Sequence, residues 1–205
     1  MTDIGQTIEH LLAHLGLPSR PDAVAALSAY AEAVCDWNRR VNLTGAKDIR
    51  AFVDGPLFDA LTVAPVVHPR GTLVDVGSGG GLPGVPLAIL YPSLEVTLSE
   101  PRGKRADFLT FVTSLLHLSA AVVRTQDREL PPGAFDGAVA QAVFPPEQWI
   151  PRGRRLLRSG GYLYVLSSAP LAPGMLPASV SADASTHWRR PLDDARRFAF
   201  RLVCR

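Results

Sequence analysis

A run of glycines near residue 80 has the spacing of a turn that binds a small molecule. A short β-branched segment over residues 72–76 precedes it and is predicted to be a strand. The glycines that follow at the Gly-x-Gly-x-x-Gly spacing are Gly79, Gly81 and Gly84. Glycines let the backbone approach a ligand without a Cβ, and a helix that starts here presents free N–H groups. The pattern therefore predicts a cofactor site between a strand and a helix.

Asp75 ends the predicted strand just before Gly77, and its charge indicates which cofactor fits. A dinucleotide carries an anionic pyrophosphate, which a carboxylate at this position repels. S-adenosylmethionine (SAM) has no phosphate, and its methionyl ammonium and its sulfonium are both cations. We therefore predict a SAM site. An NAD-linked oxidoreductase is the less favoured alternative, and a turn capped by Asp75 without any ligand is the purely structural one.

Two further acids follow the next predicted strands. Glu100 lies 21 residues beyond Gly79, the spacing at which a carboxylate meets ribose hydroxyls. An exposed acid at a strand end is the simpler interpretation. Asp127 follows the third strand, where its side chain or a neighbouring backbone N–H group would meet the adenine; a loop-capping role is equally compatible with the sequence.

Other chemistries lack their residues. The segment that starts at Gln141 and runs to Pro146 has Phe144 where amino-group methyltransferases place Asn or Asp before Pro-Pro. The two cysteines, Cys35 and Cys204, follow no core strand and are expected to pack. The five histidines have no metal-ligand spacing, so no metal site is expected.

The elements that position these residues alternate in type. Residues 1–68 read as a helical N-terminal lobe, with helices over 23–37 and around 52–61. Residues 69–205 read as an α/β, Rossmann-like core with a parallel sheet covered by helices on both faces. The strands are expected over 72–76, 94–98, 120–123, 135–142 and 162–166, and the helices over 83–90 and 104–118. Residues 168–185 are interpreted as a loop, and a C-terminal β-hairpin over 187–203 follows.

Composition sets the compartment and the class of partner. The chain has 205 residues, of which 47% are hydrophobic and 20% charged, and no apolar run is long enough to span a bilayer. The N-terminus shows no secretory signal pattern, so a cytoplasmic protein without a membrane partner is expected. A monomer is expected as well, although the sequence leaves the oligomeric state open. Residues 1–100 carry a net charge of −5 and residues 101–205 a net charge of +7. A basic half is compatible with nucleic acid or with an ordinary solvated surface. Trp37, Trp149 and Trp188 are candidates for base stacking, although core packing is the more common role.

From about residue 30 onward the chain resembles the RsmG/GidB family, class I SAM-dependent methyltransferases that act on N7 of a guanine in small-subunit ribosomal RNA. The most specific matching segments are residues 37–44 (WNRRVNLT) and 75–88 (DVGSGGGLPGVPLA), and residues 103–109 and 157–161 add to them. The resemblance implies a helical lobe on a Rossmann-like core. It also implies SAM contacts at Gly77, at Leu82 and at the pair Asp127-Arg128, with ribosomal RNA or the small ribosomal subunit as the partner.

The chain departs from the family pattern around the catalytic face. The family's Arg-His pair before its Phe-Leu-Asp-Ser-Leu stretch is Gly55-Pro56 here, its arginine after the fourth strand is Gln141, and its Lys-Gly after the fifth strand is Ser167-Ser168. Arg128 stands where the family has an acid. A non-catalytic relative that binds SAM or RNA is therefore the alternative to an active enzyme. No catalytic residue is assigned, and the predicted cofactor site consists of Asp75, Gly77, Gly79, Leu82, Glu100, Asp127, Arg128 and Gln141.

Overall fold

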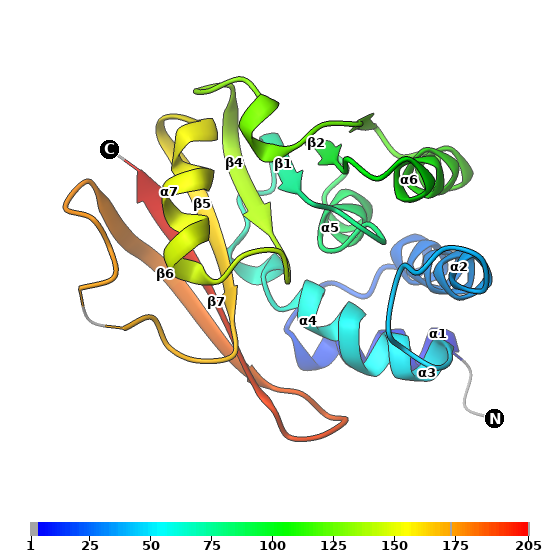
Figure 1. Cartoon of the computed structure of the whole chain (residues 1–205). Coiled ribbons are helices and arrows are strands. Elements are labelled where there is room, and N and C mark those ends of the chain that lie inside the picture. Colours follow the sequence, from blue (N-terminus) through cyan, green and yellow to red (C-terminus); the bar gives the residue numbers. More distant parts are fainter. Residues whose placement is uncertain (1–3, 173, 205) are drawn as a thin grey trace.

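A seven-stranded sheet forms the centre of the computed structural model, which describes residues 4–172 and 174–204 (Figure 1). The spatial order of the strands is β3-β2-β1-β4-β5-β7-β6. The first five are parallel, and β7 runs antiparallel to both β5 and β6. The strands are β1 (Gly71–Val76), β2 (Leu94–Ser99), β3 (Ala120–Val123), β4 (Phe135–Ala140), β5 (Leu157–Ser167), β6 (Val180–Arg189) and β7 (Arg196–Cys204). The predicted Rossmann-like fold with a C-terminal hairpin is confirmed.

Helices pack on both faces of this sheet, because its central strands are apolar on both sides. The α-helices are α1 (Ile4–His14), α2 (Pro21–Asn38), α3 (Ile49–Phe52), α4 (Phe58–Leu61), α5 (Gly84–Leu90), α6 (Gly103–Leu115) and α7 (Pro146–Leu156). A π-helical turn, Val53–Leu57, joins α3 to α4, and short 3₁₀ turns lie at Ala64–Val66 and Asp127–Glu129. The helix expected around 52–61 is therefore present, with this turn inside it.

Alternate residues of β1 point into different hydrophobic clusters. Leu73 joins a large cluster that includes buried residues of α1, α2, α5 and α6. Val74 joins a second cluster with Trp149 and Ile150 of α7. Figure 1 shows α5 and α7 on opposite sides of the sheet. The site residues at the ends of the strands thus stand on a frame that is packed from both sides.

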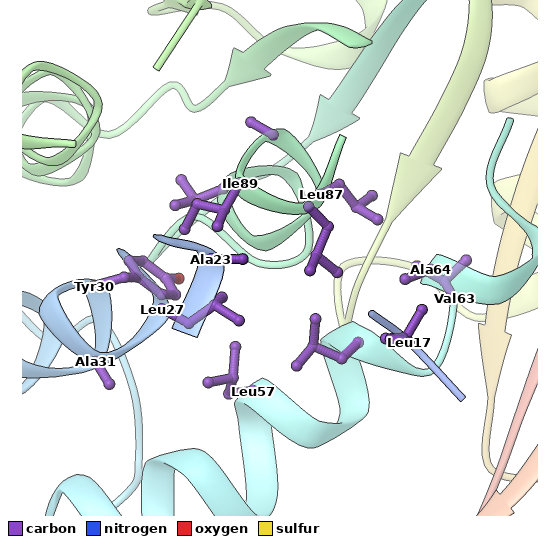
Figure 2. Packing of buried hydrophobic residues seen from close by; sticks show 14 of the residues in the cluster. Leu17, Ala23, Leu27, Tyr30, Ala31, Leu57, Val63, Ala64, Leu87 and Ile89 are labelled. Carbon is purple, nitrogen blue, oxygen red and sulfur yellow. The ribbon is translucent and has the colours of Figure 1, made fainter. Parts of the chain in front are cut away.

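The N-terminal helices share the core of the sheet. Leu27 and Tyr30 of α2, Ile89 of α5 and Leu57 of the π-helical turn gather in the space between these elements (Figure 2). All four side chains are at most 5% exposed. The predicted division into a lobe over 1–68 and a core over 69–205 stays a prediction, and continuous apolar packing joins the two parts.

The predicted loop over 168–185 is wrong in its second half. Strand β6 begins at Val180 and pairs with β7 along its whole length, with a bulge between Ala182 and Ala184. The sequence concealed this strand because small and polar residues fill its first half, which lies at the edge of the sheet. The apolar partners come from β7, so the pairing is decided by tertiary context and not by the pattern of β6 itself.

Other elements also differ from the expectation. Strand β5 begins at Leu157, five residues before the predicted 162, and helix α6 ends at Leu115, three residues before the predicted 118. Strand β4 ends at Ala140, two residues early, and Ala142 adopts a φ of 56° in the bend that follows. Helix α7 was not predicted, because prolines stand at its start and at Pro151 inside it. Its buried Trp149 donates a hydrogen bond from Nε1 to the Tyr164 carbonyl at 2.9 Å, which fixes the helix on the sheet and gives this tryptophan a core role.

Candidate active site

The glycine turn lies at the carboxyl ends of β1 and β2. The backbone N–H groups of Gly77 and Ser78 donate to the Ser99 carbonyl at 2.8 and 3.1 Å, so the turn stays attached to the neighbouring strand. Gly77, Gly79 and Gly81 have φ values of 71°, 56° and 96°, a region that side-chain-bearing residues rarely adopt. The glycines are therefore required by the backbone path, and they leave a cradle without side chains at the switch point of the sheet.

Asp75 lies completely buried beneath this turn. Its Oδ2 accepts a hydrogen bond from the Gly84 N–H group at 3.1 Å, while its Oδ1 is buried and has no partner among residues 4–172 and 174–204. Burial raises the pKa of Asp75 to about 8, although the bond from Gly84 acts in the opposite direction. An unpaired buried carboxylate is costly, and a cation bound in the turn would offset that cost. The site therefore suits the positive charges of SAM.

Glu100 reaches the glycine turn from the end of β2. Its Oε2 accepts from the Gly79 N–H group at 2.9 Å, and its Oε1 accepts from the Arg102 N–H group at 2.8 Å. The carboxylate is only 3% exposed, so it is not the exposed strand-end acid that the sequence left open. Each oxygen keeps a second lone pair, which can accept from a ribose hydroxyl.

Asp127 and Arg128 lie in the 3₁₀ turn after β3, and the Asp127 carboxylate is already engaged. Arg152 of α7 donates to its Oδ2 at 2.8 Å. Arg128 is exposed and has no acidic side chain paired with it in the described chain. Of the two contacts that the sequence left open at Asp127, the geometry therefore favours the backbone N–H groups of this turn over its carboxylate.

Gln141 lies just past the end of β4 and faces the N-terminal helices. Its Nε2 is 3.4 Å from the carbonyl oxygen of Pro56, and its Oε1 is buried without a partner in the described part of the chain.

A Cβ added at Gly55 would lie 4.0 Å from Nη1 of Arg190, so this guanidinium from the β6–β7 turn borders the space left by the glycine. Arg190 is itself held by Asp59 and Asp193, with its Nη1 3.1 Å from Asp59 Oδ2.

Leu82 belongs to the glycine turn, where its N–H group donates to the Ser78 carbonyl at 3.2 Å. The structure therefore brings Asp75, Gly77, Gly79, Leu82 and Glu100 together around one turn. Gln141 follows the end of β4, the strand that pairs with β1 beside Asp75, and Asp127 with Arg128 follows β3.

Sequence reasoning missed two side chains that support the glycine turn. Tyr30 of α2 donates from its hydroxyl to the Gly80 carbonyl at 2.6 Å. Val143 lies over Gly77, so that a Cβ added to this glycine would be 2.7 Å from Val143 Cγ2. Tyr30 lies on the buried, mainly apolar face of α2, and nothing in the sequence distinguishes its hydroxyl. Val143 follows the bend at Ala142, which has a φ of 56°. An alanine gives no sequence signal for a positive φ, so the position of Val143 over Gly77 could not be predicted.

Comparison with known families identifies the chain. The family described as GidB, rRNA small subunit methyltransferase G, matches residues 23–172. The chain belongs to the GidB family. A ribosomal RNA small subunit methyltransferase G from Anaeromyxobacter sp. (strain Fw109-5) is 35% identical over 201 residues, covering 87% of this chain and 94% of that protein. The protein of the same name from Xanthomonas campestris pv. campestris (strain B100) is 36% identical over 172 residues, covering 82% of this chain and 77% of that protein.

Solved structures support the fold of this GidB family member. A SAM-dependent methyltransferase from Aquifex aeolicus superposes with a TM-score of 0.55 at 13% identity, covering 87% of this chain and 98% of that one. A Burkholderia thailandensis 1,6-didemethyltoxoflavin N1-methyltransferase with bound S-adenosylhomocysteine gives a TM-score of 0.56 at 14% identity, covering 88% of each chain. The fold is that of class I SAM-dependent methyltransferases, and SAM is the family's cofactor.

Neither a metal-binding cluster nor a membrane-spanning helix is found in this GidB family member, within the residues that the structure describes. No group of three or more His, Cys, Asp or Glu side chains in 4–172 and 174–204 is arranged to hold a metal ion. Within the same ranges no helix has the length and apolar character needed to cross a membrane.

Proposed function

We propose that this protein transfers a methyl group from SAM to N7 of a guanine in small-subunit ribosomal RNA. The observation that carries the proposal is the buried, unpaired Oδ1 of Asp75 beneath a glycine turn in a chain of the GidB family. A dinucleotide would bring negative charge to this carboxylate, whereas SAM brings positive charge. The NAD-linked alternative has no comparable support.

SAM supplies a methyl group on a positively charged sulfur, which any nucleophile in line with the C–S bond can accept. The chain's own groups hold and orient it. Asp75 favours the cationic methionyl end, and Glu100, fixed by the Gly79 and Arg102 N–H groups, accepts from the ribose hydroxyls. Leu82 and the backbone N–H groups of Asp127 and Arg128 complete the proposed cofactor site, with Gln141 on the side that faces the substrate.

The target atom explains why no general base is required. N7 of guanine already carries a lone pair, so methyl transfer at this atom abstracts no proton in the reacting step. Alignment of three atoms and exclusion of water are then the main demands, and these are contributions of proximity and orientation. Gln141 and Ser167 stand where the family pattern has an arginine and a lysine. The loss of these two cations weakens the positioning of RNA, but it removes no group that transfers a proton.

One specific observation keeps a second function open. The amide of Gln141 contacts Pro56 and leaves Oε1 unpaired, so at this position no cation faces the substrate side of the cofactor site. A chain that binds SAM and RNA without transferring the methyl group is the corresponding alternative. For either function we propose a cytoplasmic monomer that acts on ribosomal RNA or on the assembled small subunit.

Titration calorimetry with SAM, and with NAD as the control, tests the cofactor. Small ribosomal subunits that lack the modification, incubated with the protein and methyl-labelled SAM, test the reaction. We expect binding of SAM alone and label in one guanine that is recovered as 7-methylguanine. Folded protein that binds neither cofactor would overturn the proposal, and SAM binding without label in RNA would establish the non-catalytic alternative.

A further inference from the structure

Helix α6 exposes two large apolar side chains one turn apart. Phe111 is 40% exposed and Leu115 is 47% exposed, and residues four apart lie on the same face of a helix. The ring of Trp37, at the end of α2, stacks on Phe111 with centroids 5.2 Å apart and an interplanar angle of 29°. Figure 1 shows α2 and α6 side by side at one end of the molecule. We call Trp37, Phe111 and Leu115 the α2–α6 aromatic patch.

Unpaired cations border the α2–α6 aromatic patch. Lys104 precedes Phe111 by seven residues, which places it on the same face of α6 about 10 Å away. Arg40 follows Trp37 by three residues. Both side chains are exposed, and neither has an acidic partner among the residues that the structure describes.

Two acids beside the patch are already paired with arginines. Asp36 pairs with Arg39 at 3.5 Å, and Asp107, which shares the exposed face of α6, pairs with Arg124. Lys104 and Arg40, unlike these two acids, therefore keep their charges free for a ligand.

The patch is rigidly connected to the cofactor turn. The side chain of Asn38 holds the loop after α2, because its Oδ1 accepts from the Leu43 and Thr44 N–H groups at 2.8 and 3.0 Å. The Leu43 carbonyl oxygen lies 3.4 Å from the point where a Cβ on Gly80 would stand. Arg105 of α6 donates to the Asn42 carbonyl at 2.7 Å, which ties the loop to the start of α6. The loop, α6 and the glycine turn thus form one frame.

We propose that the α2–α6 aromatic patch is a stacking platform for an unpaired base of the RNA substrate, with Lys104 and Arg40 on neighbouring phosphates. The proposal rests on the proposed function, since it concerns how the same substrate is held. A partly exposed pair of aromatic rings flanked by cations matches single-stranded nucleic acid, in which every base has a π-face and every linkage a negative charge.

A second copy of this chain fits the patch less well than RNA. In a two-fold symmetric dimer the same patch meets itself, so that Lys104 and Arg40 of one copy would approach those of the other. Like charges brought together in this way oppose association. The charge distribution therefore favours a polyanion over self-association.

Three variants at one position test the stacking step. Phe111→Leu keeps an apolar side chain but removes the ring, Phe111→Tyr keeps the ring, and Phe111→Ala removes both. We measure affinity for unmodified small-subunit ribosomal RNA, affinity for SAM by calorimetry, and the thermal unfolding of each variant. We expect about ten-fold weaker RNA binding for the leucine and alanine variants, near-normal binding for tyrosine, and unchanged affinity for SAM. RNA should also quench tryptophan fluorescence in the wild type more than in Trp37→Phe.

Charge variants test the phosphate contacts. Lys104→Ala should weaken RNA binding and lower its dependence on salt concentration by about one counterion. Arg154→Ala, which removes an exposed cation on α7 across the sheet, is the matched control and should leave both unchanged.

The outcomes separate this proposal from the proposed function. If the wild-type protein methylates RNA and the Phe111→Leu variant binds RNA with normal affinity, the stacking platform is overturned and the proposed function stays intact. Loss of a dimer in Phe111→Leu, seen by sedimentation without any change in RNA affinity, would assign the patch to self-association instead. A wild-type protein that binds SAM but neither binds nor methylates RNA would overturn both.

Discussion

The hydroxyl group of Tyr30 donates a hydrogen bond to the carbonyl oxygen of Gly80 at 2.6 Å. This bond joins α2, fifty residues earlier in the chain, to the glycine turn at the end of β1. Burial raises the pKa of Tyr30 well above its usual value, and the nearby Asp75 adds to the effect, so the hydroxyl keeps its proton throughout the physiological range. The path of the glycine turn therefore depends on the N-terminal helices as well as on the sheet.

Tyr30→Phe should weaken SAM binding several-fold, because the Gly80 carbonyl loses its donor and the turn its fixed position. The cost in folding free energy should be about 1 kcal/mol. Tyr91→Phe is the matched control, since Tyr91 also donates to a carbonyl, that of Ala64 at 2.7 Å, but away from the turn. Calorimetry with SAM distinguishes the two, and equal affinities in both variants would contradict a role for Tyr30 in the turn.

Gly77→Ala should abolish measurable SAM binding while the chain still folds. An alanine at a φ of 71° is strained, and its Cβ would come within 2.7 Å of Val143 Cγ2. The loss of stability should be about 1–3 kcal/mol. Gly45→Ala is the control, because nothing lies within 4 Å of the added methyl group and its φ is not positive. A Gly77→Ala protein with normal SAM affinity would place the cofactor elsewhere.

Glu100→Gln should weaken SAM binding about ten-fold or more. In a glutamine one carboxylate oxygen is replaced by an NH₂ group, so the side chain can no longer offer an oxygen to each of the Gly79 and Arg102 N–H groups. The remaining amide oxygen is also uncharged, so it is a weaker acceptor for the ribose hydroxyls. Glu95→Gln makes the same change at an exposed position of β2 and should have no effect. The comparison is made by SAM titration. Glu100→Ala should be at least as impaired, and normal affinity in both Glu100 variants would exclude the ribose contact.

Stability should fall as the pH rises from 5 to 8 in the SAM-free protein. The folded Asp75 has a pKa of about 8, while the carboxyl group of the unfolded chain titrates near its ordinary value of about 4. In this window the folded state holds a proton that the unfolded state has lost, so a higher pH favours unfolding.

Asp75→Asn isolates this dependence. The asparagine carbonyl can still accept from the Gly84 N–H group, but it does not titrate. The wild type should lose a few kcal/mol, in order of magnitude, more than the variant between pH 5 and 8 in denaturant titrations. Parallel pH profiles of wild type and variant would contradict the raised pKa. Saturating SAM should flatten the wild-type profile, since a bound cation favours the charged form.

Gln141→Arg should raise methylation if the site is only weakened by its missing cation. The new guanidinium would stand at the end of β4, beside Pro56, where it can contact substrate phosphate or base. Gln148→Arg, at an exposed position of α7, adds the same charge elsewhere and is the control. Labelled-methyl transfer to small subunits is the measurement. No gain in a variant that binds SAM normally would count against a weakened active enzyme.

Much of the fold could be predicted because its central strands are apolar on both faces and end in diagnostic residues. Thr72 to Asp75 and the glycines after it marked β1 and its turn, and Glu100 marked the end of β2. The first half of strand β6 was not predicted, because Ser181, Asp183 and Ser185 do not form an apolar strand pattern. These residues adopt the strand conformation because they lie at the edge of the sheet, beside β7. Local pattern carries no information about a partner that lies at the other end of a hairpin.

The glycine turn of the candidate site could be predicted, because its backbone conformation requires a particular residue, whereas the tertiary contacts of common residues could not. Glycine at positive φ leaves a signature in the sequence, so Gly77 and Gly79 were found. Tyr30 occupies a helix face, and its hydrogen bond to Gly80 depends on how α2 packs. The engagement of Asp127 by Arg152 likewise depends on α7, a helix that the prolines concealed.

The apolar cluster that Leu27 and Tyr30 share with α5 has a consequence for the energetics of the whole chain. Because one cluster extends from α1 to the sheet, the N-terminal helices and the cofactor-binding half should melt in a single calorimetric transition. Ligand bound at residues 77–84 then lowers the population of open states far from it, and amide hydrogens of α2 should exchange more slowly when SAM is present. A polypeptide cut at residue 68 would leave the apolar faces of Leu87 and Ile89 bare, and aggregation is the expected fate of that fragment.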